Sequence, residues 1–478
     1  MSEPKANGIL RPAHAATRSI LKAMGVFGGV RMFAILCSLV RNKLIAIWVG
    51  PAGVGLVILY NSFIELIGQI SRLSIDQSAV RDITASSRKD LDTIVRVVKV
   101  WSWILGVLGA LAMCLLSPLL SLWSFGNYSH WPVFCMLSAV PMFMTVFMGF
   151  SAILQGLRQF TTMARMNVVI ALLGIAASVP LIYFLREDSI KWVILSYGVA
   201  NLACVPLFRV KFKHVALTLR QIWEKGRQFI GLGILITVGT ASGLLFNYLF
   251  VLFLNRYASV DTLGIYQAGF TLVNTYVGVL FTGIWMEYFP RLTATVHSVK
   301  RTSATVSNQL SVTVWVLMPV VAFFIAADKL IVNLLYADTF MTMLPYVTLG
   351  IVGTVLRGSS WCFAHVMLAR GDGRVYVVSE TLSGVVFIVL HSLMYMHWGF
   401  AGLGVAYVLW YAFYTVFTYW IYRRRYGYTV SAAAWRSVAI AMLFCAACVA
   451  AKIVAGWWLP AVLGAAILPF AYKRVFGR

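Results

Sequence analysis

Fourteen runs of apolar residues, most of them long enough to cross a lipid bilayer, constrain this chain more than any other feature. A helix needs roughly 20 apolar residues to span a hydrocarbon core of about 30 Å. Of the 478 residues, 61% are hydrophobic and only 11% are charged, and the mean hydropathy is +0.85. A soluble chain of this length would carry more charge on its surface. The runs lie at about 24–48, 53–75, 96–119, 131–154, 164–185, 190–208, 229–254, 262–288, 310–335, 343–367, 375–397, 400–421, 437–454 and 457–472.

These runs predict an all-α polytopic membrane protein with about 14 transmembrane helices. No cleavage-site pattern precedes the first run, so we expect it to be an uncleaved anchor. The shortest runs are the last two, which meet at Trp457 and Trp458.

The net charge of +24 is placed asymmetrically along the chain. Thirty of the 39 Lys and Arg residues fall in 1–23, 72–99, 155–165, 209–228, 291–309, 368–374, 422–436 and 473–478, which are the tails and alternate loops. Cytoplasmic loops carry such an excess of cations. We therefore expect both termini in the cytoplasm and an even number of spans, and we interpret the basic charge as an orientation signal, with no nucleic acid as partner.

The sequence also repeats weakly, with an offset of about 206–215 residues. The segment "VGLVILYNSFIELI" (54–67) resembles "LGIYQAGFTLVNTY" (263–276), which aligns Gly55 with Gly264. Further matches are "VRDITA" with "PRLTA" and "YGVAN" with "LGVAY". Parallel repeats with a site between them are a transporter plan. The predicted domains are two six-helix lobes at 1–208 and 229–425, a cytoplasmic linker at 209–228, and two additional helices with a basic tail at 426–478.

The linker "RVKFKHVALTLRQIWEKGRQ" carries six Lys and Arg residues, with Val215, Leu219, Ile222 and Trp223 at near-helical spacing. This pattern is typical of a basic amphipathic helix on a membrane surface. Two interpretations stay open, a plain linker with orientation charge and an element that couples the two lobes.

Motifs for catalysis are lacking in the sequence. The segment "GPAGVG" (50–55) lacks the preceding strand and the spacing of a nucleotide-binding loop, so it predicts a tight turn between helices. No metal-ligand, nucleophile or Walker pattern is found, and the predicted outer loops are short. The seven Cys residues all lie in apolar segments, which favours small core residues over a redox or metal motif. We expect no enzyme, no metal and no cofactor.

Ionisable side chains inside the predicted spans are few. Each costs at least about 2.5 kcal/mol at the centre of a lipid-facing helix, so each should face a cavity, a partner or the headgroups. The cations are Arg31, Arg41, Lys43 and Arg357, and the acids include Glu65, Glu287 and Glu380. Polar residues of the same helices include Asn61 and Asn274, and the repeat places Asn274 opposite Glu65. Their enrichment in spans 1, 2, 7 and 8 predicts a cavity between the lobes.

Helical geometry distinguishes the three cations of the first span. Arg41 and Lys43 differ by about 200° around a helix, whereas Arg31 and Arg41 differ by about 80° and lie about 15 Å apart along it. Arg31 and Arg41 are therefore candidates for two basic stations on one face. Lys43 is close enough to Gly50 for its amine to reach the outer headgroups. Snorkelling to a headgroup is the alternative for each cation taken singly.

The run "RNKLIAIWVGPAGVGLVILYNSFIELI", followed by "LSIDQSAVRDI", resembles the start of Wzx-type O-antigen and exopolysaccharide flippases, and "RGDGR" (370–374) is similar to a turn in their second half. These proteins belong to the multidrug/oligosaccharidyl-lipid/polysaccharide exporter superfamily. The resemblance implies two six-helix lobes around a cationic cavity. It also implies an undecaprenyl-pyrophosphate-linked oligosaccharide as substrate, moved across the bacterial inner membrane with coupling to a proton or sodium gradient.

The candidate site residues fit that substrate. Arg31, Arg41 and Arg357 form the predicted pyrophosphate path, because a guanidinium can donate two parallel hydrogen bonds to a phosphate. Glu65 and Glu287 are candidates for ion coupling, with pairing to Arg31 or Arg357 as the alternative. Asn61, Asn274 and Trp361 are candidate sugar contacts. Expected partners are membrane lipids and, beyond the substrate, the polysaccharide polymerase and chain-length regulator.

Three other functions stay open at this point. The sequence alone hardly distinguishes a lipid II flippase from a flippase for lipid-linked oligosaccharides. A cation-coupled multidrug exporter would prefer an acidic cavity, and a membrane polymerase or ligase would need a larger outer loop.

Overall fold

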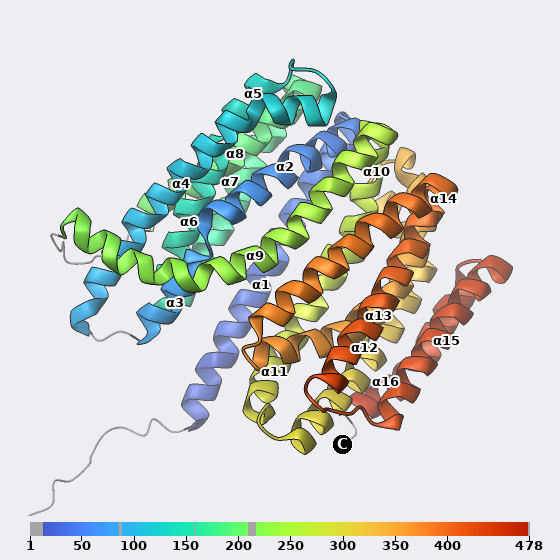
Figure 1. The fold of residues 1–478 in the computed structure, drawn as a ribbon. Helices are drawn as coiled ribbons and strands as arrows, with labels where there is room; N and C mark the ends of the chain where they lie inside the picture. The colour runs from blue at the N-terminus through green and yellow to red at the C-terminus, as the bar shows by residue number, and fades with distance from the viewer. Residues whose placement is uncertain (1–12, 86–87, 158, 209–216, 477–478) are drawn as a thin grey trace, which may run out of the picture. The chain divides into compact units, whose positions relative to one another are not determined.

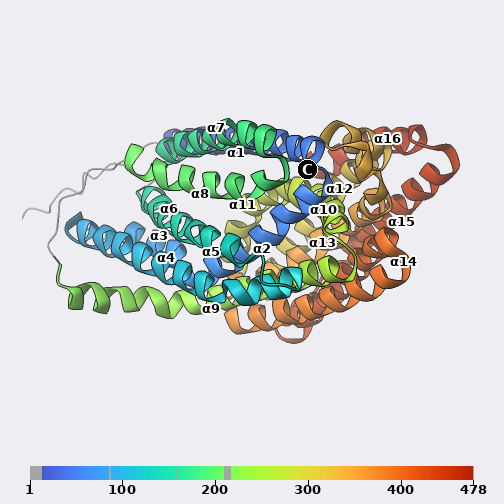
Figure 2. The same ribbon diagram turned by 90° about the horizontal axis from the view of Figure 1, so that it is seen from above.

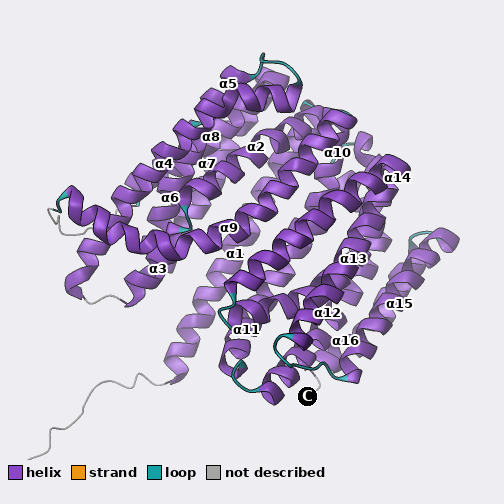
Figure 3. Ribbon diagram, viewed as in Figure 1, coloured by secondary structure: helices purple, strands orange, loops and turns teal. Residues whose placement is uncertain are grey.

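The computed structural model describes residues 13–85, 88–157, 159–208 and 217–476, and these residues form helices joined by short loops, with no strand among them (Figures 1 and 3). The chain divides into two compact units. Unit 1 comprises residues 1–41, 74–111 and 137–233, and unit 2 comprises residues 42–73, 112–136 and 234–478.

The helices follow one another with few interruptions. They are α1 (Ala13–Trp48), α2 (Pro51–Arg72), α3 (Ile75–Ala85), α4 (Arg88–Phe125), α5 (Trp131–Leu137), α6 (Ala139–Gly156), α7 (Phe160–Leu185), α8 (Ser189–Leu207), α9 (Leu219–Tyr257), α10 (Val260–Phe270), α11 (Val277–Thr295), α12 (Val299–Leu335), α13 (Leu344–Ala369), α14 (Gly373–Arg424), α15 (Ala432–Ala455) and α16 (Trp458–Phe476). The shorter elements are η1 (Arg186–Asp188), η3 (Asp338–Met343) and η2 (Thr271–Tyr276), of which η2 is a π-helix.

The predicted spans all fall on these helices, which confirms the all-α polytopic class. Ten helices among the described residues are long and apolar enough to cross a membrane. One of them, α14, holds two predicted spans, because Gly399 adopts φ 55° and ψ −135° and interrupts its helical backbone. Trp410 from the second half donates its indole N–H to the carbonyl oxygen of Ser383 in the first half, so the chain turns back at this glycine. The predicted spans in α1, in α10–η2–α11 and in α16 lie outside the ten, and the count of fourteen stays a prediction.

Unit 1 is organised around α6. This helix packs against α3 and α8, and α7 packs against α8 (Figure 2). Buried apolar side chains of α6, α7 and α8 form its core, among them Phe147, Phe150, Met166 and Cys204. The beginning of α9 belongs to this unit too, and the indole N–H of Trp101 donates to the carbonyl oxygen of Ile222 at 3.0 Å. The linker predicted at 209–228 therefore continues into α9 from Leu219, while residues 209–216 lie outside the described part of the chain.

Unit 2 contains the larger core. The helices α13, α15 and α16 pack against α12, and the two halves of α14 pack against α13 (Figure 1). Cys445 and Cys448 of α15 are free thiols buried in this core, as the sequence predicts for small core residues. Asp328 of α12 is buried and forms an ion pair with Lys452 of α15, which fixes the first of the two C-terminal helices to the unit.

The repeat becomes visible where α2 crosses α10 in unit 2. A Cβ added to Gly55 would lie 2.1 Å from the carbonyl oxygen of Val260, and one added to Gly264 would lie 1.9 Å from that of Pro51. Pro51 and Val260 are related by the same offset of 209 residues as Gly55 and Gly264. The contact is thus reciprocal between equivalent positions, as a local two-fold relation produces. Only glycine allows the two backbones to approach so closely.

Both helices at this crossing begin with clear sequence signals. In α2, Gly50 takes φ 86° and Pro51 occupies the first turn, where its missing N–H is not needed. In α10, the side chain of Ser259 accepts a hydrogen bond from the backbone N–H of Thr262 at 3.1 Å. The close α2–α10 packing explains why the contacts place α2 in unit 2, whereas the predicted lobes follow the repeat and divide the chain near residue 208. Those lobe boundaries stay a prediction.

Candidate functional site

Arg357 lies near the middle of α13 and is the deepest cation of unit 2 to which the sequence assigned a role. Its guanidinium Nη1 donates to the backbone carbonyl oxygen of Asn274 at 3.3 Å, and its Cζ lies 5.0 Å from the ring centroid of Phe281. Across the described residues, no carboxylate forms an ion pair with it. A cation within a membrane span normally finds an acid or lines a polar cavity. Arg357 is therefore available to an anion from outside the chain.

Neutral groups surround this guanidinium. The hydroxyl of Tyr407 donates to the side-chain oxygen of Asn274 at 3.0 Å, and the ring of Tyr411 lies 4.9 Å from that of Tyr407. Trp361 packs edge-on against Phe281, with the ring centroids 5.5 Å apart. Aromatic rings and a carbonyl stabilise a cation without neutralising it. The structure thus brings together three residues that the sequence predicted, Arg357, Asn274 and Trp361.

A second polar group of unit 2 surrounds Glu65 of α2. A cavity of about 130 Å³ is lined by oxygen-bearing side chains and by apolar ones, namely Asn42, Asn61, Glu65, Gln267, Thr271 and Tyr336, with Ile45, Val54, Val57, Ile58 and Ala268. It is large enough to hold water. A carboxylate together with amide and hydroxyl oxygens can bind a hard cation or a proton carried by water. Two further predicted residues, Asn61 and Glu65, meet here.

The π-helix η2 connects the two groups. Thr271, its first residue, lines the Glu65 cavity, and Asn274, three residues later, holds Arg357. Gln267 donates to the hydroxyl of Thr271 at 3.4 Å, and that hydroxyl donates to the Gln267 carbonyl oxygen at 2.8 Å. A π-helical turn is rare and is frequent at functional sites. The repeat-related segment of α2 is an ordinary α-helix, so the sequence alignment gives no sign of this turn.

Glu287 has different surroundings from Glu65. It lies on α11 with a largely exposed side chain and forms an ion pair with Arg291, whose Nε is 2.7 Å from its Oε1. Arg291 also donates to the side-chain oxygen of Gln309 at 2.8 Å. Among the described residues, the ion-pair partner of Glu287 is thus Arg291, one turn along the same helix, and not Arg357. This is the geometry of an exposed helical ion pair.

The cations of α1 fall in different places. Arg41 belongs to unit 1, where its guanidinium lies 5.5 Å from the ring centroid of Tyr197, and no ion pair to it is found among the described residues. Lys43 belongs to unit 2 and donates to the carbonyl oxygen of Leu334 at 2.6 Å, close to the last residue of α12. A cation at a helix C-terminus is stabilised by the helix dipole. The side chain of Arg31 lies outside the part of the structure that is described.

Sequence reasoning missed the tyrosines beside Arg357 and the amide of Asn42 beside Glu65. Tyr407 and Tyr411 occur in a segment rich in aromatics, which is typical of packing, and Asn42 is a single polar residue in an apolar run. Polar residues inside predicted spans are the signal that could have found Asn42. Among the described residues, no three His, Cys, Asp or Glu side chains gather as ligands for a metal ion.

The fold defines a class, a polytopic all-α membrane protein that is similar in fold to solved structures of MOP superfamily transporters. A multidrug resistance MATE family transporter of that superfamily, in an inward-facing conformation, superposes with a TM-score of 0.69 at 15% identity over 84% of this chain and 96% of that one. The lipid II flippase MurJ, in an inward closed conformation, gives 0.67 at 12% identity over 94% and 98%. A MOP superfamily transporter from Pyrococcus furiosus gives 0.63 at 17% identity over 85% and 97%.

The family follows from the sequence. Residues 44–345 match the family described as "Polysaccharide biosynthesis protein", and this chain belongs to that family. None of the curated proteins compared with the chain matches it.

Proposed function

We propose that this protein is a flippase that moves undecaprenyl-pyrophosphate-linked oligosaccharide repeat units across the bacterial inner membrane by alternating access. The product would serve O-antigen or exopolysaccharide biosynthesis. Membership in the polysaccharide biosynthesis family supports the pathway, and the MOP fold supports transport without chemical conversion of the substrate. A multi-pass location in the inner membrane, with both termini in the cytoplasm, belongs to the same proposal.

The observation that carries the proposal is the unneutralised guanidinium of Arg357. A pyrophosphate needs cations along its route, because moving a charge into a medium of low dielectric is costly. Arg357 supplies a cation held by a carbonyl and by aromatic rings, with no carboxylate to displace. We assign it the pyrophosphate, with Trp361 and Asn274 beside it as sugar contacts. Arg41 and Arg31 of α1 complete the predicted path from the sequence.

We assign ion coupling to Glu65. Its cavity offers oxygen donors to a proton or a sodium ion, and η2 joins that cavity to the Arg357 site through Thr271 and Asn274. A change of charge at Glu65 that alters the π-helical turn would move the carbonyl that Arg357 binds. Glu287 receives no coupling role, because its carboxylate is exposed and paired.

A multidrug exporter is the second candidate within the fold, since a MATE transporter is among the similar structures. Binding of a cationic drug beside Arg357 is disfavoured, because the guanidinium there is itself a cation and would repel it. The substrate of a lipid II flippase would contain the same pyrophosphate and differ in its sugar. The polymerase and the chain-length regulator of the pathway are proposed as partners.

Complementation of a strain deleted for its repeat-unit flippase tests the proposal. The wild-type chain should restore surface polysaccharide and remove accumulated lipid-linked repeat units. Arg357→Ala at normal membrane abundance should restore neither, and Arg291→Ala, which removes an exposed paired cation, should behave as wild type. Full export by Arg357→Ala would overturn the assignment.

A further inference from the structure

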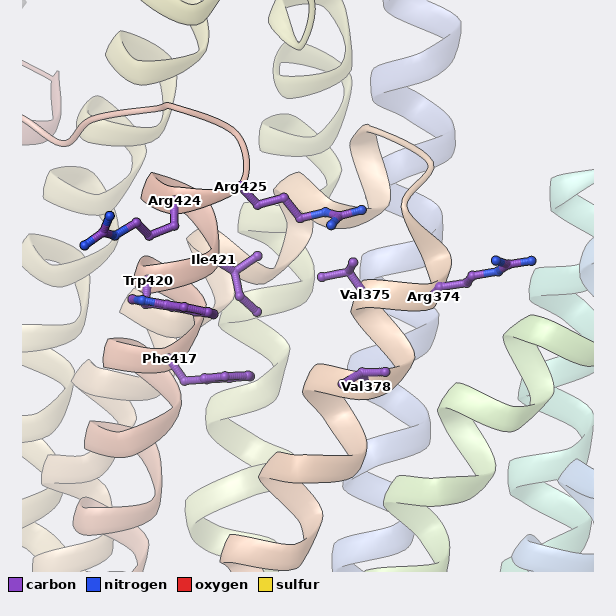
Figure 4. Close-up of a pocket in the computed structure, with 8 residues that line it drawn as sticks. All are labelled: Arg374, Val375, Val378, Phe417, Trp420, Ile421, Arg424 and Arg425. Carbon is purple, nitrogen blue, oxygen red and sulfur yellow. The ribbon is translucent and has the colours of Figure 1, made fainter.

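A cavity of about 470 Å³ lies between the two halves of α14 (Figure 4). Neither Arg357 nor Glu65 is among the residues that line it. Its lining residues are Arg374, Val375, Val378, Phe417, Trp420, Ile421, Arg424 and Arg425. We refer to it as the α14 pocket. All these residues belong to unit 2, and none has a role in the function proposed above.

The walls of the α14 pocket are apolar. Val375 and Val378 project from the first half of the helix, facing Phe417, Trp420 and Ile421 of the second half (Figure 4). Val378 is 64% exposed and Trp420 is 57% exposed. Side chains of this size and exposure near the end of a membrane helix are covered by hydrocarbon when the protein is in a bilayer.

Arginines surround one end of the α14 pocket. Arg425 extends across it, whereas Arg374 and Arg424 point outward on either side (Figure 4). Asp372 forms an ion pair with Arg425 at 2.8 Å. Among the described residues, no acid forms an ion pair with Arg374 or Arg424. Arg374 and Arg424 are both exposed. The rim thus has an excess of positive charge, at the end of α14 that the charge asymmetry assigns to the cytoplasm.

An apolar stripe continues from the α14 pocket along the first half of α14. Its members are exposed and spaced by three or four residues, namely Val378, Leu382, Val385 and Val389. Eleven residues of helix measure about 17 Å, which is close to half of the roughly 30 Å hydrocarbon core. The stripe therefore has the length of one lipid chain in one leaflet.

We propose that the α14 pocket binds an anionic phospholipid of the cytoplasmic leaflet, with its phosphate among Arg374, Arg424 and Arg425 and one acyl chain against the stripe. Basic pockets between membrane helices on the cytoplasmic side recognise such headgroups. A soluble phosphate compound would not need the apolar walls, and a neutral lipid would not need the arginines. The pocket is thus a lipid site separate from the route proposed for the substrate.

Native mass spectrometry of the purified full-length protein tests this inference. The protein is titrated with phosphatidylglycerol, with phosphatidylcholine, and with glycerol phosphate as the headgroup without chains. A Lys or Arg near an anionic surface contributes about 1 kcal/mol, so the Arg374→Gln/Arg424→Gln double variant should bind phosphatidylglycerol about 30-fold more weakly. Val378→Ser/Trp420→Ser should also weaken it. Arg423→Gln is the matched control, because Arg423 is exposed on the same turn but does not line the pocket.

Each outcome of this titration either supports or overturns the proposed lipid site. Preferential binding of phosphatidylglycerol that is lost in the arginine pair and kept in Arg423→Gln supports the site. Equal binding of phosphatidylcholine, an equal loss in Arg423→Gln, or equally tight binding of glycerol phosphate would overturn it. Tighter binding of undecaprenyl phosphate at the same residues would assign the pocket to the substrate carrier instead. Export by complementation serves as a check that the variants fold.

Discussion

Replacing Arg357 with methionine should separate transport from stability. The guanidinium contributes one hydrogen bond to the Asn274 carbonyl and a contact with Phe281, and its removal leaves no carboxylate unpaired among the described residues. Because the loss of this hydrogen bond is offset by the removal of a part-buried charge without an acidic partner, we expect the free energy of unfolding to change by about 1 kcal/mol or less. A hydrogen bond to a charged group contributes about 1.5–3 kcal/mol, so the affinity for a pyrophosphate substrate should fall about 10- to 150-fold.

Lys452→Met provides the matched comparison. Lys452 pairs with Asp328, whose side chain is 1% exposed, so the variant leaves a buried carboxylate without its partner. Removing one member of a buried ion pair costs about 3–5 kcal/mol. Both variants remove one cation from unit 2. Lys452→Met should lose thermal stability, whereas Arg357→Met should largely keep it.

The assay measures the thermal unfolding midpoint of each purified variant in detergent and binding of a water-soluble pyrophosphate-oligosaccharide analogue. Arg357→Lys should keep part of the affinity, since the charge remains and the planar fork does not. A loss of stability in Arg357→Met as large as that in Lys452→Met would refute the reasoning, because Arg357 would then be a structural cation.

Three further predictions concern other parts of the chain. Glu65→Gln should abolish the dependence of export on pH or on sodium while Glu287→Gln leaves it intact; unchanged ion dependence in Glu65→Gln would remove the coupling role. Gly55→Ala and Gly264→Ala should each destabilise the protein by about 1–3 kcal/mol, because the added Cβ meets a carbonyl oxygen, while Gly243→Ala, with open space around it, should not; a thermal midpoint equal to wild type in the first two would contradict the close crossing. Partial burial opposes ionisation of Asp372, but hydrogen bonds from Arg425 and Tyr426 outweigh it and lower the pKa of this carboxyl. Since the folded pKa lies below the ordinary value of about 3.9, the stabilisation is present above that pH and is lost as the pH falls through the folded pKa; the unfolding midpoints of wild type and Asp372→Asn should converge in acid, and parallel curves would count against it.

Much of the fold could be predicted from the sequence because a bilayer restricts spanning segments to helices of about 20 apolar residues. The repeat aligned Gly55 with Gly264, and the structure places both where α2 crosses α10. The apolar runs at 375–397 and 400–421 predicted two spans where the structure has α14, which is interrupted at Gly399. By contrast, η2 leaves no pattern in the sequence, because an extra residue in one helical turn depends on tertiary packing.

The candidate site could be predicted only in part. Arg357 and Glu65 are conspicuous because a charge within an apolar run demands an explanation. The tyrosine beside Arg357 was not predicted, since Tyr407 lies far away along the chain and contacts of that kind depend on the fold. Glu287 lies four residues before Arg291, a spacing that allows an ion pair on one helix, and the structure shows this pair.

Flipping by purified protein in proteoliposomes tests the central claim most directly. The vesicles contain a fluorescent undecaprenyl-pyrophosphate-linked oligosaccharide, and the measurement is the fraction of labelled sugar exposed on the outer surface over time. The account predicts exchange between leaflets that requires the pyrophosphate and is lost in Arg357→Met. Exchange that is equally fast for a carrier without phosphate, or no exchange by the wild-type protein under an imposed proton or sodium gradient, would contradict it.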